Sequence, residues 1–260
     1  MFWRWSLFLL LAVLASACRS TQDPGRYERH FDSAVWQQGL ARQAEDSAQW
    51  GTEATFGVLA GGLAFFDRDL SRDARHHYIT GGNTSSGDAL SLAVGFSPLL
   101  LGGVDWMQGD HGESFEVASE ALLLTGGVTQ ALKLITGRHR PNDNSSKDAF
   151  PSGHVSLAAA GATLIAREIE ARTGSRLGYW IFVPVIYVAI DRVEGERHWA
   201  SDVAAGAALG MFLANWVYNA HYPDAEHSRR SIFRAREKIA WSLGPTLIDD
   251  KLALGVTIAF

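Results

Sequence analysis

A lysine and an arginine stand at a spacing that brings two positive charges to the end of a predicted helix. Lys133 lies within the apolar segment 117–135, and Arg140 follows in the loop, directly before Pro141. Gly137 offers a C-cap between them, and Pro141 prevents the helix from continuing. We therefore expect Lys133 and Arg140 to converge, where they can bind an anion or simply cap the helix.

A second group, Pro151-Ser152-Gly153-His154, opens the small-residue segment 154–166. Ser152 is a favourable N-cap, and Gly153 lets backbone N–H groups approach an anion at the positive end of a helix. His154 adds a side chain that can give or take a proton. The group fits a phosphate site, and it also fits an ordinary helix N-terminus.

A third group contains Arg192, His198 and Asp202. We expect His198 and Asp202 to share one helix face, because residues four apart point to the same side. The carboxylate can then accept a hydrogen bond from one imidazole nitrogen and orient the other. Such a pair is common on surfaces too, so the argument depends on the three groups occurring together.

In this order and spacing the three groups resemble the type 2 phosphatidic acid phosphatase superfamily, which includes bacterial class A acid phosphatases and vanadium haloperoxidases. Its pattern is Lys-x6-Arg-Pro, then Pro-Ser-Gly-His, then Ser-Arg-x5-His-x3-Asp, and the resemblance covers about residues 50–220. Asp191 departs from it, because it stands where the pattern has Ser. An acid there would repel a dianion unless Arg192 or Arg197 holds it aside, which bears on substrate affinity and pH optimum.

The resemblance implies a metal-independent phosphatase that hydrolyses phosphate monoesters, whether a lipid phosphate, a lipid pyrophosphate or a soluble ester. It implies that His198 is the nucleophile that forms a phosphohistidine, that Asp202 orients it, and that His154 protonates the leaving group. Three cations and two helix-start donors would bind the phosphate: Lys133, Arg140, Arg192, Ser152 and Gly153. Because these fixed charges neutralise the substrate, we expect no metal and no cofactor.

Two other functions stay open at this point. The same cradle would bind vanadate with His198 as its ligand, which would make the protein a haloperoxidase. A non-catalytic envelope lipoprotein with a decayed site is the other alternative, and Asp191 is its one hint.

Composition limits the choice of partners. The 260 residues carry 23 Lys and Arg against 28 Asp and Glu, a formal net charge of −5. This balance disfavours nucleic-acid binding, which needs a basic face. The single cysteine, Cys18, rules out an intrachain disulfide and a cysteine-rich zinc site.

The positioning elements are six apolar segments in which small residues recur at helical intervals, which predicts closely packed helices. The resemblance and this pattern together give the fold class: an all-α helical bundle of the acid phosphatase/vanadium haloperoxidase type. The bundle domain would span residues 51–220, with its apolar segments at 54–66, 89–104, 117–135, 154–166, 177–190 and 203–220.

The ends of the chain are predicted separately. In 221–260 a charged helix precedes a run of alternating apolar residues that predicts a short C-terminal β-hairpin. Residues 1–18 read as an export signal in which Cys18 resembles the lipobox cysteine of bacterial lipoproteins, and 19–50 is a polar tether or peripheral helix.

These signals place the protein in the bacterial cell envelope, on the periplasmic side. Cys18 lipidation or the apolar segments would attach it to a membrane, and a phosphate ester, lipid or soluble, would be its partner. A polytopic inner-membrane protein is the alternative. We favour a water-soluble bundle, because the apolar segments are short for spanning helices, which need about 20 apolar residues, and Glu120 and Lys133 interrupt the third.

Overall fold

The computed structural model describes residues 33–74, 76, 78–81, 84–107, 112–143, 145–173, 176–222, 240–248 and 251–259. Of residues 47–49, 171–173 and the two strands, only the backbone is described. The predicted signal 1–18 with Cys18, part of the tether and most of the charged helix lie outside the described residues. These predictions, and the domain boundaries that depend on them, stay predictions.

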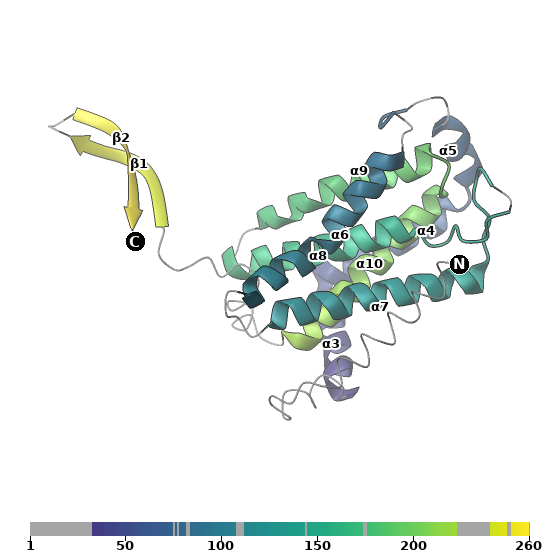
Figure 1. Cartoon of the computed structure of the whole chain (residues 1–260), viewed down its shortest axis with the longest axis horizontal. Helices are drawn as coiled ribbons and strands as arrows, with labels where there is room; N and C mark the ends of the chain where they lie inside the picture. The colour runs from purple at the N-terminus through teal and green to yellow at the C-terminus, as the bar shows by residue number, and fades with distance from the viewer. Residues whose placement is uncertain are drawn as a thin grey trace.

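The described part of the 51–220 region is helical, as expected, and its long helices run roughly side by side (Figure 1). Each predicted apolar segment lies in or across these helices. The elements are α3 (Ser33–Glu45), α4 (Ser47–Leu63), α5 (Asp67–Ala74), α6 (Thr84–Met107), α7 (Glu113–Thr136), α8 (Gly153–Thr173), the 3₁₀ helix η1 (Arg176–Ile181), α9 (Phe182–Glu194) and α10 (Ala200–His221).

Helices α8 and α10 form the centre of the bundle. Alanine dominates the buried face of α8, where Ala158, Ala159 and Ala162 are completely buried. Opposite them, Gly206 and Gly210 of α10 lie against α8: a Cβ at Gly206 would stand 2.6 Å from the Ser152 carbonyl oxygen. Only a residue without a side chain permits this approach. The small-residue pattern therefore brings the first turns of α8 and α10 together. His154 lies in the first turn of α8, and His198 stands two residues before α10.

The remaining helices surround this pair. Val94 of α6 and Val188 of α9 join one buried cluster with α8, and Val117 and Leu122 of α7 join a second one with α10. Helix α3 packs on the outside of the bundle, since Trp36 lies edge-on against Trp216 of α10 with ring centroids 5.5 Å apart.

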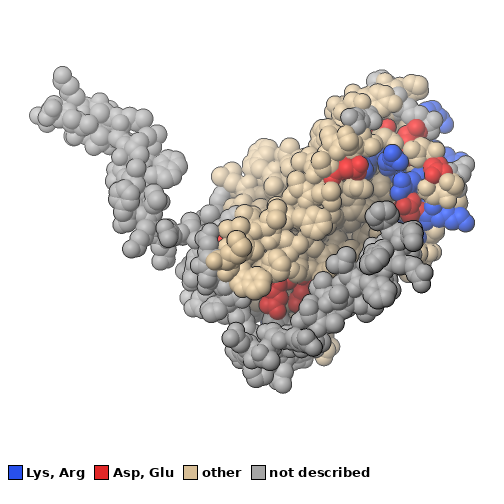
Figure 2. All heavy atoms as spheres, in the orientation of Figure 1, with Lys and Arg blue, Asp and Glu red and all other residues tan. Residues whose placement is uncertain are grey.

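Large apolar side chains also cover much of the outer surface. On the face shown in Figure 2, most charged side chains gather at the end where α5 lies. Apart from a small acidic patch at the lower edge, uncharged residues cover the rest of the described helices. Within the described part of the chain, two helices are long and apolar enough to cross a membrane: α6, with 33% of its apolar window buried, and α10, with 67% buried. Exposed apolar residues on α4, α6, α7 and α9 include Val58, Leu59, Leu92, Leu100, Leu134, Ile135, Val183 and Ile186.

At the C-terminal end, β1 (Ala240–Ile248) and β2 (Lys251–Ala259) pair antiparallel, with Ala240 opposite Ala259 and Ile248 opposite Lys251.

Candidate active site

The site lies where one end of each of α6, α7, α8, α9 and α10 meets. Lys133 occupies the last turn of α7, which ends as predicted: Gly137 is left-handed, with φ 52°, and its N–H donates to the Lys133 carbonyl. A Cβ at Gly153 would stand 3.7 Å from Lys133 Cε, so the end of α7 adjoins the start of α8. Two of the three predicted groups therefore come together through helix ends.

His198 is deeply buried in this junction, with 3% of its surface exposed. Its Nδ1 lies 2.7 Å from the Ala149 carbonyl oxygen. A carbonyl only accepts, so Nδ1 carries the proton and Nε2 keeps its lone pair. Burial, and then the positive charges of Lys133 and Arg140, lower the pKa of His198 to about 3. The imidazole is therefore neutral near physiological pH, in the tautomer that leaves Nε2 free to attack.

The prediction of a direct hydrogen bond between Asp202 and His198 is wrong. The closest separation, Nδ1 to Oδ2, is 4.0 Å, which is too long for a hydrogen bond. The reason is local: α10 begins at Ala200, and Trp199 before it is extended at ψ 157°, so His198 is not on the helix. The four-residue rule for a shared helix face does not apply there.

Asp202 instead fastens the loop that carries His198. Its Oδ2 accepts the Trp199 backbone N–H at 2.9 Å, and its Oδ1 accepts Arg138 Nη1 at 2.6 Å. Arg138 also donates to Asp67 Oδ2 at 2.6 Å, and Asp67 accepts the Ser201 N–H at 2.9 Å. Sequence reasoning missed Arg138 and Asp67, although Arg138 lies inside the first group.

His154 is more exposed than His198, with 40% of its side chain accessible. Its Nε2 lies 2.9 Å from Asp88 Oδ1, and Arg192 Nη1 donates to the same oxygen at 2.6 Å. Burial, and then the positive charge of Arg192, lower the pKa of His154, whereas Asp88 raises it. His154 can therefore exchange protons, and Asp88 is a third residue that sequence reasoning missed.

Each of the predicted cations donates hydrogen bonds to acceptors that fix the orientation of its side chain. Lys133 donates to the Asp148 carbonyl, and Arg140 holds the Asp148 carboxylate with two bonds of 2.8 and 2.7 Å. Arg192 bonds Asp191 through Nε and Nη2, at 3.1 and 2.5 Å. Arg192 thus holds Asp191 aside, which was the condition under which an acid at this position is tolerable.

The Ser152 side chain does not cap α8 as predicted. Its hydroxyl is buried and has no hydrogen-bond partner among the described residues. Its backbone N–H donates to the Asp202 carbonyl at 3.0 Å, which ties the start of α8 to α10. A buried hydroxyl without a partner is costly unless something else satisfies it, as a bound oxyanion would. Among the described residues there is no group of three or more His, Cys, Asp or Glu that could hold a metal ion.

The sequence profile of the PAP2 superfamily matches residues 117–225, a range that contains every predicted site residue. The chain contains a PAP2 superfamily domain. Among curated relatives, a Lipid A 1-phosphatase from Porphyromonas gingivalis is 39% identical over 106 residues, which cover 39% of this chain and 23% of that protein. Lipid phosphate phosphatase 1 from Arabidopsis thaliana is 28% identical over 144 residues, 41% of this chain and 44% of the relative.

A solved structure has the same fold as this PAP2 domain. It is described as the first transmembrane PAP2 type phosphatidylglycerolphosphate phosphatase from Bacillus subtilis, and it matches with a TM-score of 0.50 and 20% identity, covering 66% of this chain and 95% of that chain. At this identity the likeness concerns the fold alone. The chain spans less than half the length of the two curated relatives named above.

Proposed function

We propose that this protein is a phosphatase that removes the phosphate group from a lipid phosphate through a phosphohistidine on His198. The observation that carries the proposal is the state of this imidazole. It is buried, it is neutral because burial and nearby cations lower its pKa to about 3, and its Nδ1–H bond to Ala149 leaves Nε2 with the lone pair. A neutral nitrogen nucleophile beside cations suits attack on an anionic phosphate.

The first half-reaction needs two residues on opposite sides of the phosphorus atom. The lone pair of His198 Nε2 forms the N–P bond while the P–O bond to the leaving group breaks. His154, in its protonated form, gives its proton to the departing oxygen, a role for which its partial exposure and its Asp88 contact suit it. The product is a neutral alcohol, and His154 is left neutral.

The second half-reaction reverses these roles. Neutral His154 takes a proton from a water molecule, whose oxygen forms a bond to phosphorus as the N–P bond breaks. Inorganic phosphate leaves, and His198 and His154 return to their starting states. In both halves Lys133, Arg140 and Arg192 would hold the phosphate oxygens, with the Ser152 hydroxyl and the Gly153 N–H as further donors.

A lipid is the substrate class we propose, with soluble esters as the alternative. The relatives carry lipid phosphatase names, and an apolar surface of the extent seen here marks a membrane or partner contact. We therefore propose that lipid surrounds the exposed apolar side chains of α4, α6, α7 and α9, and that the charged site end lies at the membrane surface. This replaces the preference for a water-soluble bundle, which was based on the length of apolar runs and not on the folded surface. The periplasmic location and Cys18 lipidation stay predictions.

The test is phosphate release from phosphatidic acid by the full chain purified in a non-ionic detergent with EDTA present. We expect turnover, and we expect His198→Asn to lose at least ~10³-fold in kcat, because binding groups alone give little chemistry. His76→Asn is the matched control, since His76 lies in an exposed turn. Normal turnover by His198→Asn, or halide oxidation with vanadate and peroxide in place of phosphate release, would refute the proposal.

The covalent intermediate has its own test. With p-nitrophenyl phosphate, whose leaving group needs no protonation, His154→Asn should form the phosphohistidine and then hydrolyse it slowly. We expect acid-labile, base-stable phosphate bound to this variant after quenching, and none on the His154→Asn/His198→Asn double variant. Equal labelling of both variants would place the nucleophile elsewhere.

A further inference from the structure

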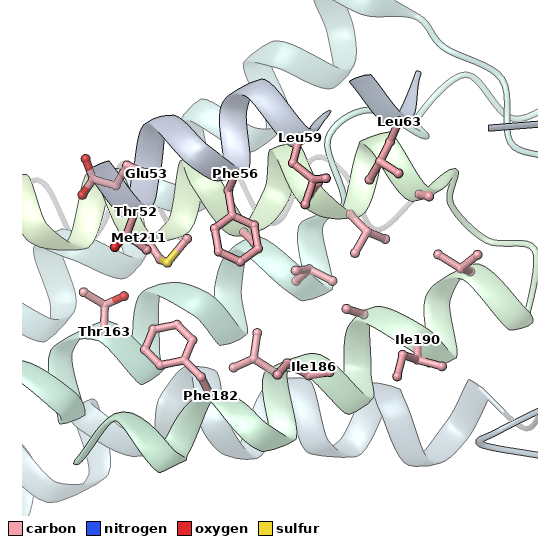
Figure 3. Close-up of a pocket in the computed structure, with 18 of the residues that line it drawn as sticks. Thr52, Glu53, Phe56, Leu59, Leu63, Thr163, Phe182, Ile186, Ile190 and Met211 are labelled. Atoms are coloured by element: carbon pink, nitrogen blue, oxygen red, sulfur yellow. The ribbon is translucent and has the colours of Figure 1, made fainter. Parts of the chain in front are cut away.

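A long apolar groove lies beside the site and is not used by the chemistry described above. Its volume is about 1040 Å³, and α4 and α9 form its walls while α8 and α10 contribute to its floor. Phe56 of α4 and Phe182 of α9 point toward each other across it, and Leu59, Leu63, Ile186 and Ile190 extend the same two walls (Figure 3). Such a lining favours hydrocarbon over a polar ligand.

One end of the groove adjoins the catalytic residues through three separate elements. Val155, Val193 and Ala200 line the groove. In the chain, Val155 directly follows His154, Val193 directly follows Arg192, and Ala200 stands two residues after His198. Since neighbours in the chain are neighbours in space, this end of the groove lies next to the site.

The length of the groove can be measured along α10, which lines it from Ala200 to Asn215. At the α-helical rise these residues span about 22 Å. That exceeds one leaflet of a bilayer, which is about half of a ~30 Å hydrocarbon core. An extended acyl chain of a membrane lipid fits this length.

The far end of the groove is polar. Glu53 is 5% exposed, and it accepts Gln43 Nε2 at 2.7 and 2.8 Å and Asn215 Nδ2 at 2.9 Å. Figure 3 shows Glu53, Thr52, Thr163 and Met211 gathered at this end. Hydrocarbon gains nothing by advancing past buried polar groups that already bond each other, so the groove has a defined end.

The rim of the groove is apolar and open. Leu59 is 45% exposed and Ile186 58% exposed, one on each wall. The volume of about 1040 Å³ is large enough for a hydrocarbon chain of this length. The rim residues belong to the same exposed apolar surface that we place in lipid, from which a chain can enter sideways.

We propose that this groove binds one acyl chain of the lipid phosphate substrate and limits the length of chain that the enzyme accepts. The proposal rests on the proposed function and deepens it, because it assigns substrate selection to residues outside the catalytic groups. The phosphate stays between His154 and His198, the chain lies between α4 and α9, and its methyl end stops at the Glu53 cluster.

The test fills the groove and compares two substrates. Ala204 and Ala189 both line it, so Ala204→Phe and Ala189→Phe should each block a long chain. In mixed micelles of one detergent, we expect kcat/KM for dipalmitoyl phosphatidic acid to fall at least ~10-fold and kcat/KM for dibutyryl phosphatidic acid to change less than ~2-fold, since filling removes apolar contacts only. Gly126→Leu is the control, because a Cβ there meets nothing within 4 Å.

A third variant acts in the opposite direction. Met211 lies at the polar end, so Met211→Ala should lengthen the groove and move the preferred chain to a longer one. This shift would not arise from misfolding, and it therefore tests the proposal even where the Phe variants fold poorly. Equal losses on both substrates with no shift in Met211→Ala would overturn the proposal and point to another occupant, such as a second protein surface.

A binding experiment separates this proposal from the proposed function. A phosphatidic acid with a photoreactive group near the end of one acyl chain should label peptides of α4 and α9, and Ala204→Phe should reduce the labelling, whether or not the lipid is hydrolysed. Labelling without turnover would refute the phosphatase and keep the groove, and turnover with labelling only elsewhere would do the reverse.

Discussion

The two histidines of the site differ in exposure and in the group that each one contacts. In the half built from α7 and the start of α10, His198 is 3% exposed and bonds a backbone carbonyl. In the half built from α6, α8 and α9, 40% of the His154 side chain is accessible, and it contacts the Asp88 carboxylate. A carbonyl fixes a tautomer without adding charge, whereas a carboxylate favours the protonated imidazole.

The difference supports the chemical roles proposed for the two histidines. The imidazole that stays neutral can attack phosphorus, and the imidazole that faces a carboxylate and solvent can carry a proton to the leaving group and take one from water. In each half an aspartate positions the histidine. Asp88 lies outside the three sequence groups, and Asp202 belongs to the third group but acts without bonding His198. Asp202 holds the His198 loop, and Asp88 holds His154 and Arg192. Changing each aspartate in turn tests the contrast.

The largest effect is expected from Asp202→Asn. An amide can still bond either the Trp199 N–H or Arg138, but it loses the charge-assisted pair with Arg138 and leaves His198 less firmly placed. We expect kcat for phosphatidic acid to fall about 100-fold with KM nearly unchanged, less than for a change at a bonded triad aspartate, because Asp202 does not touch the imidazole.

The control for Asp202→Asn is Asp69→Asn, which removes a solvent-exposed ion pair with Arg72. Arg138→Gln should repeat the Asp202→Asn phenotype, and the double variant should be no worse than the more severe single one. Fully additive losses would mean that Asp202 acts on His198 by a route that does not pass through Arg138.

These two aspartates also show what the sequence can and cannot predict. The first, second and third groups lie in short continuous stretches, and the small residues of α8 and α10 imply their close packing. The all-helical fold and the meeting of the three groups at one end of the bundle could therefore be predicted. The lack of a direct hydrogen bond between Asp202 and His198 could not be predicted, because it depends on where α10 begins. Asp88 contacts Arg192, which lies 104 residues away in the chain, and no spacing rule connects such positions.

A smaller and more specific effect is expected from Asp88→Asn. Asp88 raises the pKa of His154, so its removal lowers that pKa further. A general acid works only while protonated, so activity is lost as pH rises through its pKa, and the alkaline fall in kcat/KM should begin at a lower pH in the variant. We expect kcat for phosphatidic acid to fall about 10-fold near neutral pH, which is less than the ~10²–10⁴-fold contributed by general acid–base catalysis, because His154 itself is still present.

The leaving group distinguishes this role from a merely structural one. With p-nitrophenyl phosphate, which departs without a proton, Asp88→Asn should lose much less activity, whereas Asp202→Asn should lose as much as with the lipid. An alkaline limb of the kcat/KM profile that does not move in Asp88→Asn would contradict the division of roles between the two halves. Equal losses of activity on both esters would contradict it too.

The smallest effect on turnover is expected where the two halves meet. Gly206→Ala places a methyl group 2.6 Å from the Ser152 carbonyl, which must move α10 away from the start of α8. We expect a loss of about 1–3 kcal/mol in the free energy of unfolding, typical of overpacking, seen as a lower Tm in detergent. Because His154 lies in the first turn of α8 and His198 stands two residues before α10, both histidines shift with the helix starts. We expect kcat to fall only a few-fold, while KM for short-chain and long-chain lipids rises equally. Gly127→Ala, where a Cβ meets nothing within 4 Å, should leave both Tm and kcat unchanged.

An unchanged Tm in Gly206→Ala would mean that the contact between α8 and α10 yields easily. The distance between the two histidines would then have to be fixed by the backbone hydrogen bond from the Ser152 N–H to the Asp202 carbonyl instead.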